Sequence, residues 1–167
     1  MADEIRTERL VMRRARPDDV TALHRIMSDP VAMRYWSTPP HTELATTEAW
    51  LESMIGADPA HSDDFIITLD GASIGKLGAW KLPDVGFLID PAEWGRGLAS
   101  EALAAFIARR RALGSAELLA DVDPRNTPSL KLLERHAFVE THRVAGTWKV
   151  GDALCDSVYL RLDLRPR

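Results

Sequence analysis

Residues 85–105 read VGFLIDPAEWGRGLASEALAA. The apolar run Phe87-Leu88-Ile89 ends at Asp90-Pro91, which is typical of a buried strand with an abrupt end. Apolar residues then recur at helical spacing, which predicts a helix that begins near Leu98. Between the strand and the helix lies a turn that contains Gly95 and Gly97.

This turn predicts an anion-binding site. The first turn of a helix leaves backbone N–H groups without partners, and the helix dipole adds about half a positive charge there. Gly95 and Gly97 allow a ligand to approach the backbone because no Cβ stands in the way. We therefore expect a phosphate or a pyrophosphate at this point.

Two common phosphate-binding motifs do not fit the spacing of the glycines. A Walker loop ends in Gly-Lys-Ser/Thr, whereas Gly97 is followed by Leu98. A dinucleotide fingerprint needs Gly or Ala at its sixth place, where this chain has Ser100. A nucleotide-binding oxidoreductase or kinase would also carry its glycine loop near the start of a βαβ series, whereas this loop lies in mid-chain after a predicted meander.

The run Trp94-Gly95-Arg96-Gly97-Leu98-Ala99 resembles the pyrophosphate loop of the GNAT superfamily of N-acetyltransferases, usually written Gln/Arg-x-x-Gly-x-Gly/Ala. Trp94 replaces the usual Gln or Arg. The wider run 90–102 is similar to the branch that acetylates the N-termini of ribosomal proteins, in which an aromatic residue before the glycine is common.

A second motif supports the same resemblance. Asn126-Thr127-Pro128-Ser129 is followed by a helical pattern and by Ala137-Phe138. The family's usual form is Asn-x-x-Ser, an amphipathic helix and then Gly-Phe, so Ala137 departs from the family at one position, which affects only the turn geometry.

The composition predicts one soluble globular domain over residues 1–167, with 46% hydrophobic and 28% charged residues. The formal charge of −4 argues against a nucleic-acid binder. Cys155 is the only cysteine, which excludes an intrachain disulfide and favours the cytoplasm. The sequence predicts no signal peptide, no membrane helix of about 20 apolar residues and no metal site, since it has no spaced His cluster.

Periodicity and turn residues predict the following elements. Strands are expected at residues 9–14, 65–69, 72–80, 85–90, 118–122, 138–144 and 154–162. Helices are expected from residue 16 onward and at residues 30–36, 46–55, 98–113 and 128–136. This order is that of the GNAT fold, a mixed α/β (α+β) class with a central, mostly antiparallel sheet, a splayed parallel pair and flanking helices.

The resemblance implies that acetyl-CoA lies between the diverging strands 87–90 and 118–122. It assigns cofactor contacts to the first of these strands, the glycine loop and the second motif: Phe87, Leu88, Ile89, Trp94, Gly95, Arg96, Gly97, Leu98, Ala99, Ser100, Asn126, Ser129 and Arg135. Asn126 would bond the pantetheine arm, and Ser129 would donate to the departing sulfur. The simpler alternatives are that both residues cap a helix and that Arg135 is only solvated.

Acyl transfer from a thioester to an amine needs an uncharged amine, a polarised carbonyl and a stabilised thiolate. Relatives often carry a Glu on the penultimate strand as general base, but residues 144–148 contain none. The candidates for the base are Asp156, which completes a catalytic set with Asn126 and Ser129, and also His142, Glu140 and Asp84.

Three aromatic residues are candidates for an amine pocket, although large aromatics are usually core residues. They are Tyr35, Trp36 and Trp80. We expect the first two helices and residues 141–156 to shape this acceptor site.

Together these patterns predict a cytoplasmic acyl-CoA-dependent N-acyltransferase. It would transfer acetyl from acetyl-CoA to a primary amine, in a protein N-terminus or a small molecule, within a ternary complex. The resemblance is compatible with a homodimer, and implies no metal, nucleic-acid or membrane partner. The rival interpretation is a CoA-binding regulatory module of the same fold without catalysis.

Overall fold

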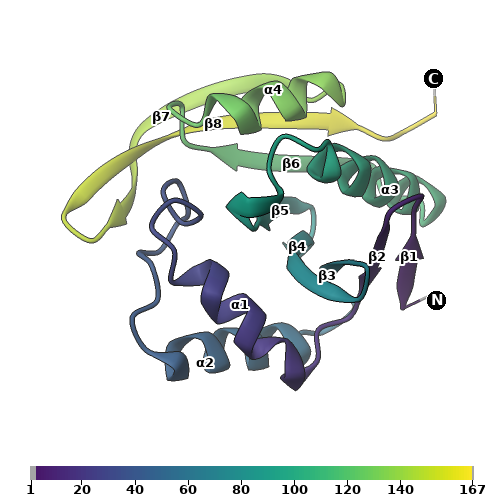
Figure 1. Ribbon diagram of the computed structural model, residues 1–167. Helices are drawn as coiled ribbons and strands as arrows, with labels where there is room; N and C mark the ends of the chain where they lie inside the picture. Colours follow the sequence, from purple (N-terminus) through teal and green to yellow (C-terminus); the bar gives the residue numbers. More distant parts are fainter. Residues whose placement is uncertain (1–2, 167) are drawn as a thin grey trace.

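The computed structural model describes residues 3–166 and contains one eight-stranded sheet with helices on both faces (Figure 1). The strands are β1 (Glu4–Arg6), β2 (Leu10–Arg13), β3 (Asp63–Leu69), β4 (Ala72–Lys81), β5 (Asp84–Ile89), β6 (Glu117–Val122), β7 (Val139–Val150) and β8 (Ala153–Asp163). The helices are α1 (Val20–Met27), α2 (Leu44–Ile55), α3 (Leu98–Ala112) and α4 (Thr127–Arg135), with short 3-10 turns η1 (Pro17–Asp19) and η2 (Pro91–Glu93). The strand order is β1-β2-β3-β4-β5-β6-β8-β7, and among these described strands only the β5–β6 pair is parallel.

The two faces of the sheet are covered by different helix pairs, because side chains alternate along each strand. On β3, Phe65 packs edge-on against Phe106 of α3, within the large cluster that also includes α4 residues. Its neighbour Ile66 points the other way and packs with Leu23 of α1 and Leu51 of α2. Figure 1 shows α1 and α2 on one side of the strands and α3 and α4 on the other.

The predicted mixed fold is confirmed, including the β3–β4–β5 meander and the helix that begins at Leu98. The structure adds β1, which the sequence analysis did not predict. It also extends β7 to Val150, well past the predicted end at residue 144. Gly151 closes this longer hairpin with φ +58°.

The helix predicted at residues 30–36 is wrong. Asp29 Oδ1 accepts a hydrogen bond from the Val31 N–H at 2.8 Å, and the backbone then forms separate turns from Met33 to Asp29 and from Trp36 to Met33. A segment this short gains too few helical hydrogen bonds to offset the cost of nucleation. These residues form an irregular connection between α1 and α2, which lies near the β7–β8 hairpin in Figure 1.

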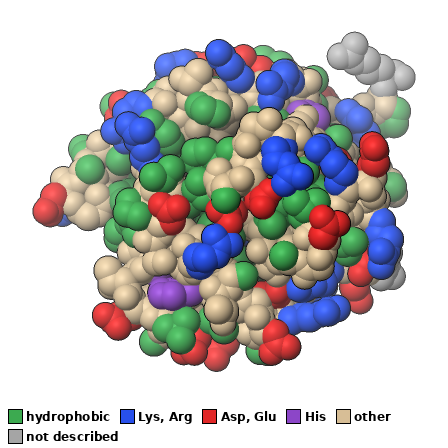
Figure 2. Space-filling view, in the orientation of Figure 1, with side chains coloured by type: hydrophobic (Ala, Val, Ile, Leu, Met, Phe, Trp, Pro, Cys, Tyr) green, Lys and Arg blue, Asp and Glu red, His purple; other side chains and the backbone are tan. Residues whose placement is uncertain are grey.

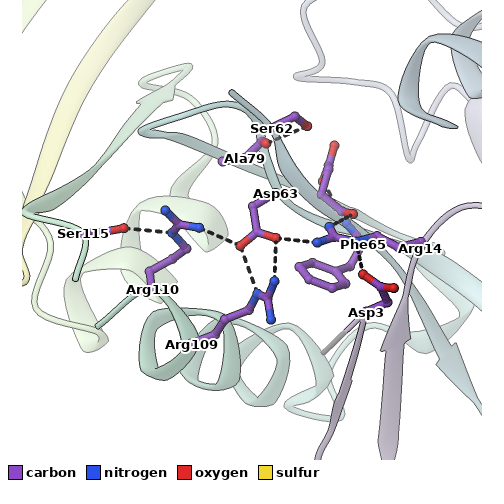
Figure 3. A network of polar contacts seen from close by, with 10 residues as sticks. Asp3, Arg14, Ser62, Asp63, Phe65, Ala79, Arg109, Arg110 and Ser115 are labelled. Carbon is purple, nitrogen blue, oxygen red and sulfur yellow. Dashed lines mark hydrogen bonds and ion pairs between the residues drawn. The ribbon is translucent and has the colours of Figure 1, made fainter. Parts of the chain in front are cut away.

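A buried ionic cluster ties β3 to the end of α3, away from the glycine loop (Figure 3). The Asp63 carboxylate is 3% exposed and accepts hydrogen bonds from Arg14 at 2.9 Å, Arg109 at 3.0 Å and Arg110 at 2.8 Å. Burial raises the pKa of this carboxyl, but the three guanidinium groups outweigh burial and lower the pKa overall. Arg14 also lies over the Phe65 ring, 4.2 Å from its centroid.

Replacing Asp63 with asparagine should lower the free energy of unfolding by about 3 kcal/mol, because it leaves buried guanidinium groups without a counter-charge. Since the folded pKa is depressed, this stability is complete above the ordinary pKa of 3.8 and is lost as the pH falls below it. Urea denaturation at pH 7 and pH 3 measures both effects. Glu4→Gln, which removes an exposed ion pair with Arg6, is the control and should cost less than about 1 kcal/mol.

Candidate active site

The glycine loop forms an open anion cradle at the start of α3. Gly95 and Gly97 have φ of +76° and +74°, and a Cβ built on Gly95 meets nothing within 4 Å. The first helical hydrogen bond runs from the Glu101 N–H to the Gly97 carbonyl. Three N–H groups precede this bond and have no partner inside the helix, namely those of Leu98, Ala99 and Ser100. The geometry therefore fits a diphosphate, as the sequence predicted.

The side chains of the loop hold it in place and do not point at one centre. The Trp94 indole N–H donates to the Ile89 carbonyl at 2.9 Å, which ties the loop to the end of β5. Arg96 forms an ion pair with Glu93, three residues earlier. Leu98 is buried in the core, so only its backbone N–H is available to a ligand.

Beside this loop the sheet opens between β5 and β6. The two strands pair at a single position, Asp84 with Leu119, and the Leu119 N–H donates to the Pro83 carbonyl at 3.0 Å. Beyond that point β6 continues to pair with β8 as far as Val122 and Val158, whereas β5 pairs only with β4. The splayed parallel pair predicted from the resemblance is confirmed.

The backbone of β5 presents alternate residues to this opening. The Asp90 N–H donates to the Ile74 carbonyl of β4, and backbone groups two residues apart point to the same side of a strand. Leu88 therefore faces β4. Phe87 and the Ile89 N–H face the opening, where an extended polar chain could form hydrogen bonds as an added strand does.

The second motif lies at the start of α4. Asn126 Oδ1 accepts a hydrogen bond from the Ser129 N–H at 3.3 Å, so Asn126 caps the helix. The Ser129 hydroxyl takes no part in this cap and has no hydrogen-bond partner within residues 3–166. At the other end of α4, His136 Nε2 lies 2.7 Å from the hydroxyl of Ser100 in the first turn of α3, and the preceding Arg135 is exposed.

The three aromatic candidates lie in different surroundings. The Arg125 guanidinium lies 5.6 Å from the centroid of the Tyr35 ring, which joins the α1–α2 connection to the start of α4. Trp36 packs against the cluster that contains Leu88. Trp80 is 67% exposed at the end of β4, so a core position is wrong for this residue.

Two acidic residues share the sheet face that carries Trp36. Asp84 is four residues before Leu88, so both side chains point to the same face of the sheet. Asp121 lies between the core residues Ala120 and Val122, so its side chain points away from that core and toward the same face as Leu88. Burial raises the pKa of the Asp84 carboxyl, and the nearby negative charge of Asp121 adds to this rise, with Lys81 opposing it.

The other candidates for the base are engaged elsewhere. Asp156 accepts a hydrogen bond from the Gly146 N–H at 2.9 Å and supports the irregular part of the β7–β8 hairpin. Glu140 is held by Arg143, whose hydrogen bond lowers the pKa of its carboxyl. The His142 ring stacks on Tyr159 with a centroid separation of 4.5 Å.

The sequence analysis missed residues that the fold brings to this region. The Trp148 indole N–H donates to Asp121 Oδ2 at 2.9 Å, which fixes that carboxylate. The alternation in residues 118–122 could have placed Asp121 on the open face, but pairing with Trp148 depends on the register of three strands. Arg125 likewise contacts both Tyr35 and Cys155, at 3.6 Å from the sulfur.

The open cradle and the gap beside β5 suit a ligand with a diphosphate at one end and an extended amide-bearing arm. This geometry defines an acyl-CoA-dependent transferase. The family "Acetyltransferase (GNAT) domain" matches residues 9–139, and the chain belongs to this family. It is therefore an N-acetyltransferase that uses acetyl-CoA as its acetyl donor.

Similar proteins agree with this assignment. The "Uncharacterized N-acetyltransferase p20" of Bacillus licheniformis is 28% identical over 142 residues, which cover 79% of this chain and 80% of that protein. A GNAT acetyltransferase structure from Bacillus anthracis has a TM-score of 0.84 and 21% identity, with coverage of 96% and 98%. The ribosomal-protein alpha-N-acetyltransferase RimL in complex with coenzyme A has a TM-score of 0.85 and 17% identity, with coverage of 96% and 97%.

Within residues 3–166 no helix is both long and apolar enough to span a bilayer. No group of three or more His, Cys, Asp or Glu residues in this part of the chain could hold a metal ion. Figure 2 shows Lys and Arg in small groups among acidic and apolar side chains on the face that it presents.

Proposed function

We propose that this enzyme acetylates a primary amine by direct transfer in a ternary complex. The observation that carries the proposal is the single paired position between β5 and β6, beyond which the two strands diverge toward the end of β5 that leads to α3. The diphosphate of acetyl-CoA would lie against the backbone N–H groups of residues 95–100, and its arm would lie along Phe87. Acetyl-CoA supplies an acetyl group activated as a thioester.

Ser129 is our candidate for protonating the departing sulfur. When the amine nitrogen bonds to the carbonyl carbon and the C–S bond breaks, the sulfur leaves with the electron pair and needs a proton. The Ser129 hydroxyl is free to donate because Asn126 uses only the Ser129 backbone N–H. The serine then recovers its proton from water.

Ser129→Ala should lower kcat about 10-fold and leave the Kd for acetyl-CoA within a factor of two, because the helix cap does not use the hydroxyl. Stopped assays of thiol release and calorimetric titration with CoA separate the two quantities. Equal losses of turnover and affinity would instead assign the residue a structural role. Ser115, whose hydroxyl accepts from Arg110 at the far end of α3, provides the control variant Ser115→Ala.

Asp84 is our candidate for the general base. It lies at the last paired position before the strands diverge, and although the residue is exposed, partial desolvation of its carboxyl raises the pKa, which favours proton acceptance. Phe87 lies three residues further along β5, about 10 Å away along the strand, so we expect the proton to pass through water.

The acceptor would be a cationic amine before it reacts. Asp84 and Asp121 place two carboxylates on the face that also carries Trp36, and the neighbouring Tyr35 lies against Arg125. Similarity in fold to RimL, named as a ribosomal-protein alpha-N-acetyltransferase, supports a protein N-terminus as one class of acceptor. Small-molecule amines are the other class. The cytoplasmic location and a homodimer stay predictions from the sequence.

A turnover assay with a panel of amines tests the proposal. The purified protein would be incubated with acetyl-CoA and with N-terminal peptides, polyamines and aminoacyl compounds, while free thiol is measured. We expect thiol release with at least one primary amine and none with its N-acetylated form. Tight binding of CoA without turnover across the panel would favour the regulatory module.

A further inference from the structure

The turn between β1 and β2 contacts the glycine loop and the first turn of α3. Arg9 Nη1 donates to the Arg96 carbonyl at 2.8 Å, inside the loop. Arg9 Nε donates to Glu101 Oε2 at 2.7 Å, and the Arg9 backbone N–H donates to Glu101 Oε1 at 2.8 Å. The Thr7 hydroxyl also donates to this carboxylate. One arginine therefore joins the loop, the helix and the N-terminal hairpin.

The charge of Glu101 makes this contact relevant to an anion. A carboxylate in the first turn of a helix is favourable for the helix dipole but repels a bound diphosphate. Burial raises the pKa of the Glu101 carboxyl, yet hydrogen bonds from Thr7 and Arg9 outweigh burial and lower the pKa overall, so the group is ionised. Arg9 supplies the opposite charge at hydrogen-bond distance.

The remaining nitrogen of the Arg9 guanidinium, Nη2, lies beside Gly97 of the glycine loop. A Cβ built on Gly97 would lie 3.7 Å from Arg9 Nη2, and no other atom lies within 4 Å of it outside the adjoining backbone. Nη1 and Nε are used by Arg96 and Glu101, whereas Nη2 has no hydrogen-bond partner within residues 3–166.

We propose that Arg9 is a positioning residue for the diphosphate of acetyl-CoA. It holds the Arg96 carbonyl so that the loop N–H groups stay free, and it neutralises Glu101 beside the anion. The N-terminal hairpin thus belongs to the cofactor site. This inference rests on the proposed position of the diphosphate at the start of α3.

The test compares two acetyl donors, because acetyl-pantetheine has the same thioester and arm as acetyl-CoA but no diphosphate. For Arg9→Gln we expect KM for acetyl-CoA to rise about 10-fold, with kcat unchanged and with KM for acetyl-pantetheine unchanged. Arg9→Lys retains the charge and should raise KM for acetyl-CoA by about 3-fold. The control is Arg6→Gln in the same hairpin, where the exposed arginine pairs with Glu4 alone among residues 3–166.

The outcomes separate the positioning role from a structural one. A KM increase of the same size for both donors, or no increase in either variant, would overturn the proposal. If Arg9→Gln does not fold, KM for the two donors is compared in Arg9→Lys instead. An increase for acetyl-CoA alone supports the positioning role, and an equal increase for both donors overturns it. A wild-type enzyme that uses both donors equally well would instead contradict the diphosphate site itself.

Discussion

Gly97→Glu should reduce affinity for acetyl-CoA about 1000-fold while the fold survives. A carboxylate at this position would face the diphosphate, and like charges in contact cost several kcal/mol. The left-handed backbone at Gly97, with φ +74°, adds about 1–2 kcal/mol of strain for any residue with a Cβ. Calorimetric titration with CoA measures the affinity, and circular dichroism checks the fold.

The opposite end of α3 offers a matched control for this variant. Gly114 has φ +75° and open space around a built Cβ, so Gly114→Glu introduces the same strain and the same charge. It follows the last turn of the helix, far from the free N–H groups. We expect CoA affinity within about twofold of the wild type for Gly114→Glu, since the strain alone does not touch the cradle. Similar losses in the two variants would assign the effect to folding.

The cofactor side of the site could be predicted from the sequence because its parts are local. The strand end, Gly95, Gly97 and the helix start lie within a few residues, and each has a strong conformational preference. Asn126 and Ser129 are also local, since they share one helix turn. Ala137 adopts φ +66° where the family usually has glycine, so the departure in sequence did not change the turn.

The acceptor side could not be predicted in the same way. Residues 30–36 carry apolar residues at helical spacing, yet this short segment forms turns, and Met33 and Trp36 pack in a cluster with Leu88 of β5. The contact of Arg9 with the glycine loop depends on a hairpin that reaches a helix about ninety positions later. The pairing of Asp121 with Trp148 depends on the order of β6, β8 and β7. Such contacts come from tertiary packing, on which local patterns give no information.

Asp84→Asn should lower kcat by about 100- to 1000-fold, which lies within the usual contribution of a general base, with little change in CoA affinity. The acidic limb of the kcat profile should vanish, because asparagine does not titrate. In the wild-type enzyme, the acidic limb should keep its position on the pH axis when the acceptor is replaced by an amine of different pKa. Asp152→Asn, at the exposed β7–β8 turn, is the control and should leave the profile unchanged.

Removing either of two neighbouring charges should shift this acidic limb, in opposite directions for the two charges. A purely structural role for Asp84 predicts no such shifts. Asp121 raises the pKa of the Asp84 carboxyl and Lys81 lowers it. Asp121→Asn should therefore move the acidic limb to lower pH, and Lys81→Gln should move it to higher pH. Both shifts should shrink at high ionic strength, because these charges are near the surface. Shifts in the same direction, or a full limb in Asp84→Asn, would show that another group accepts the proton.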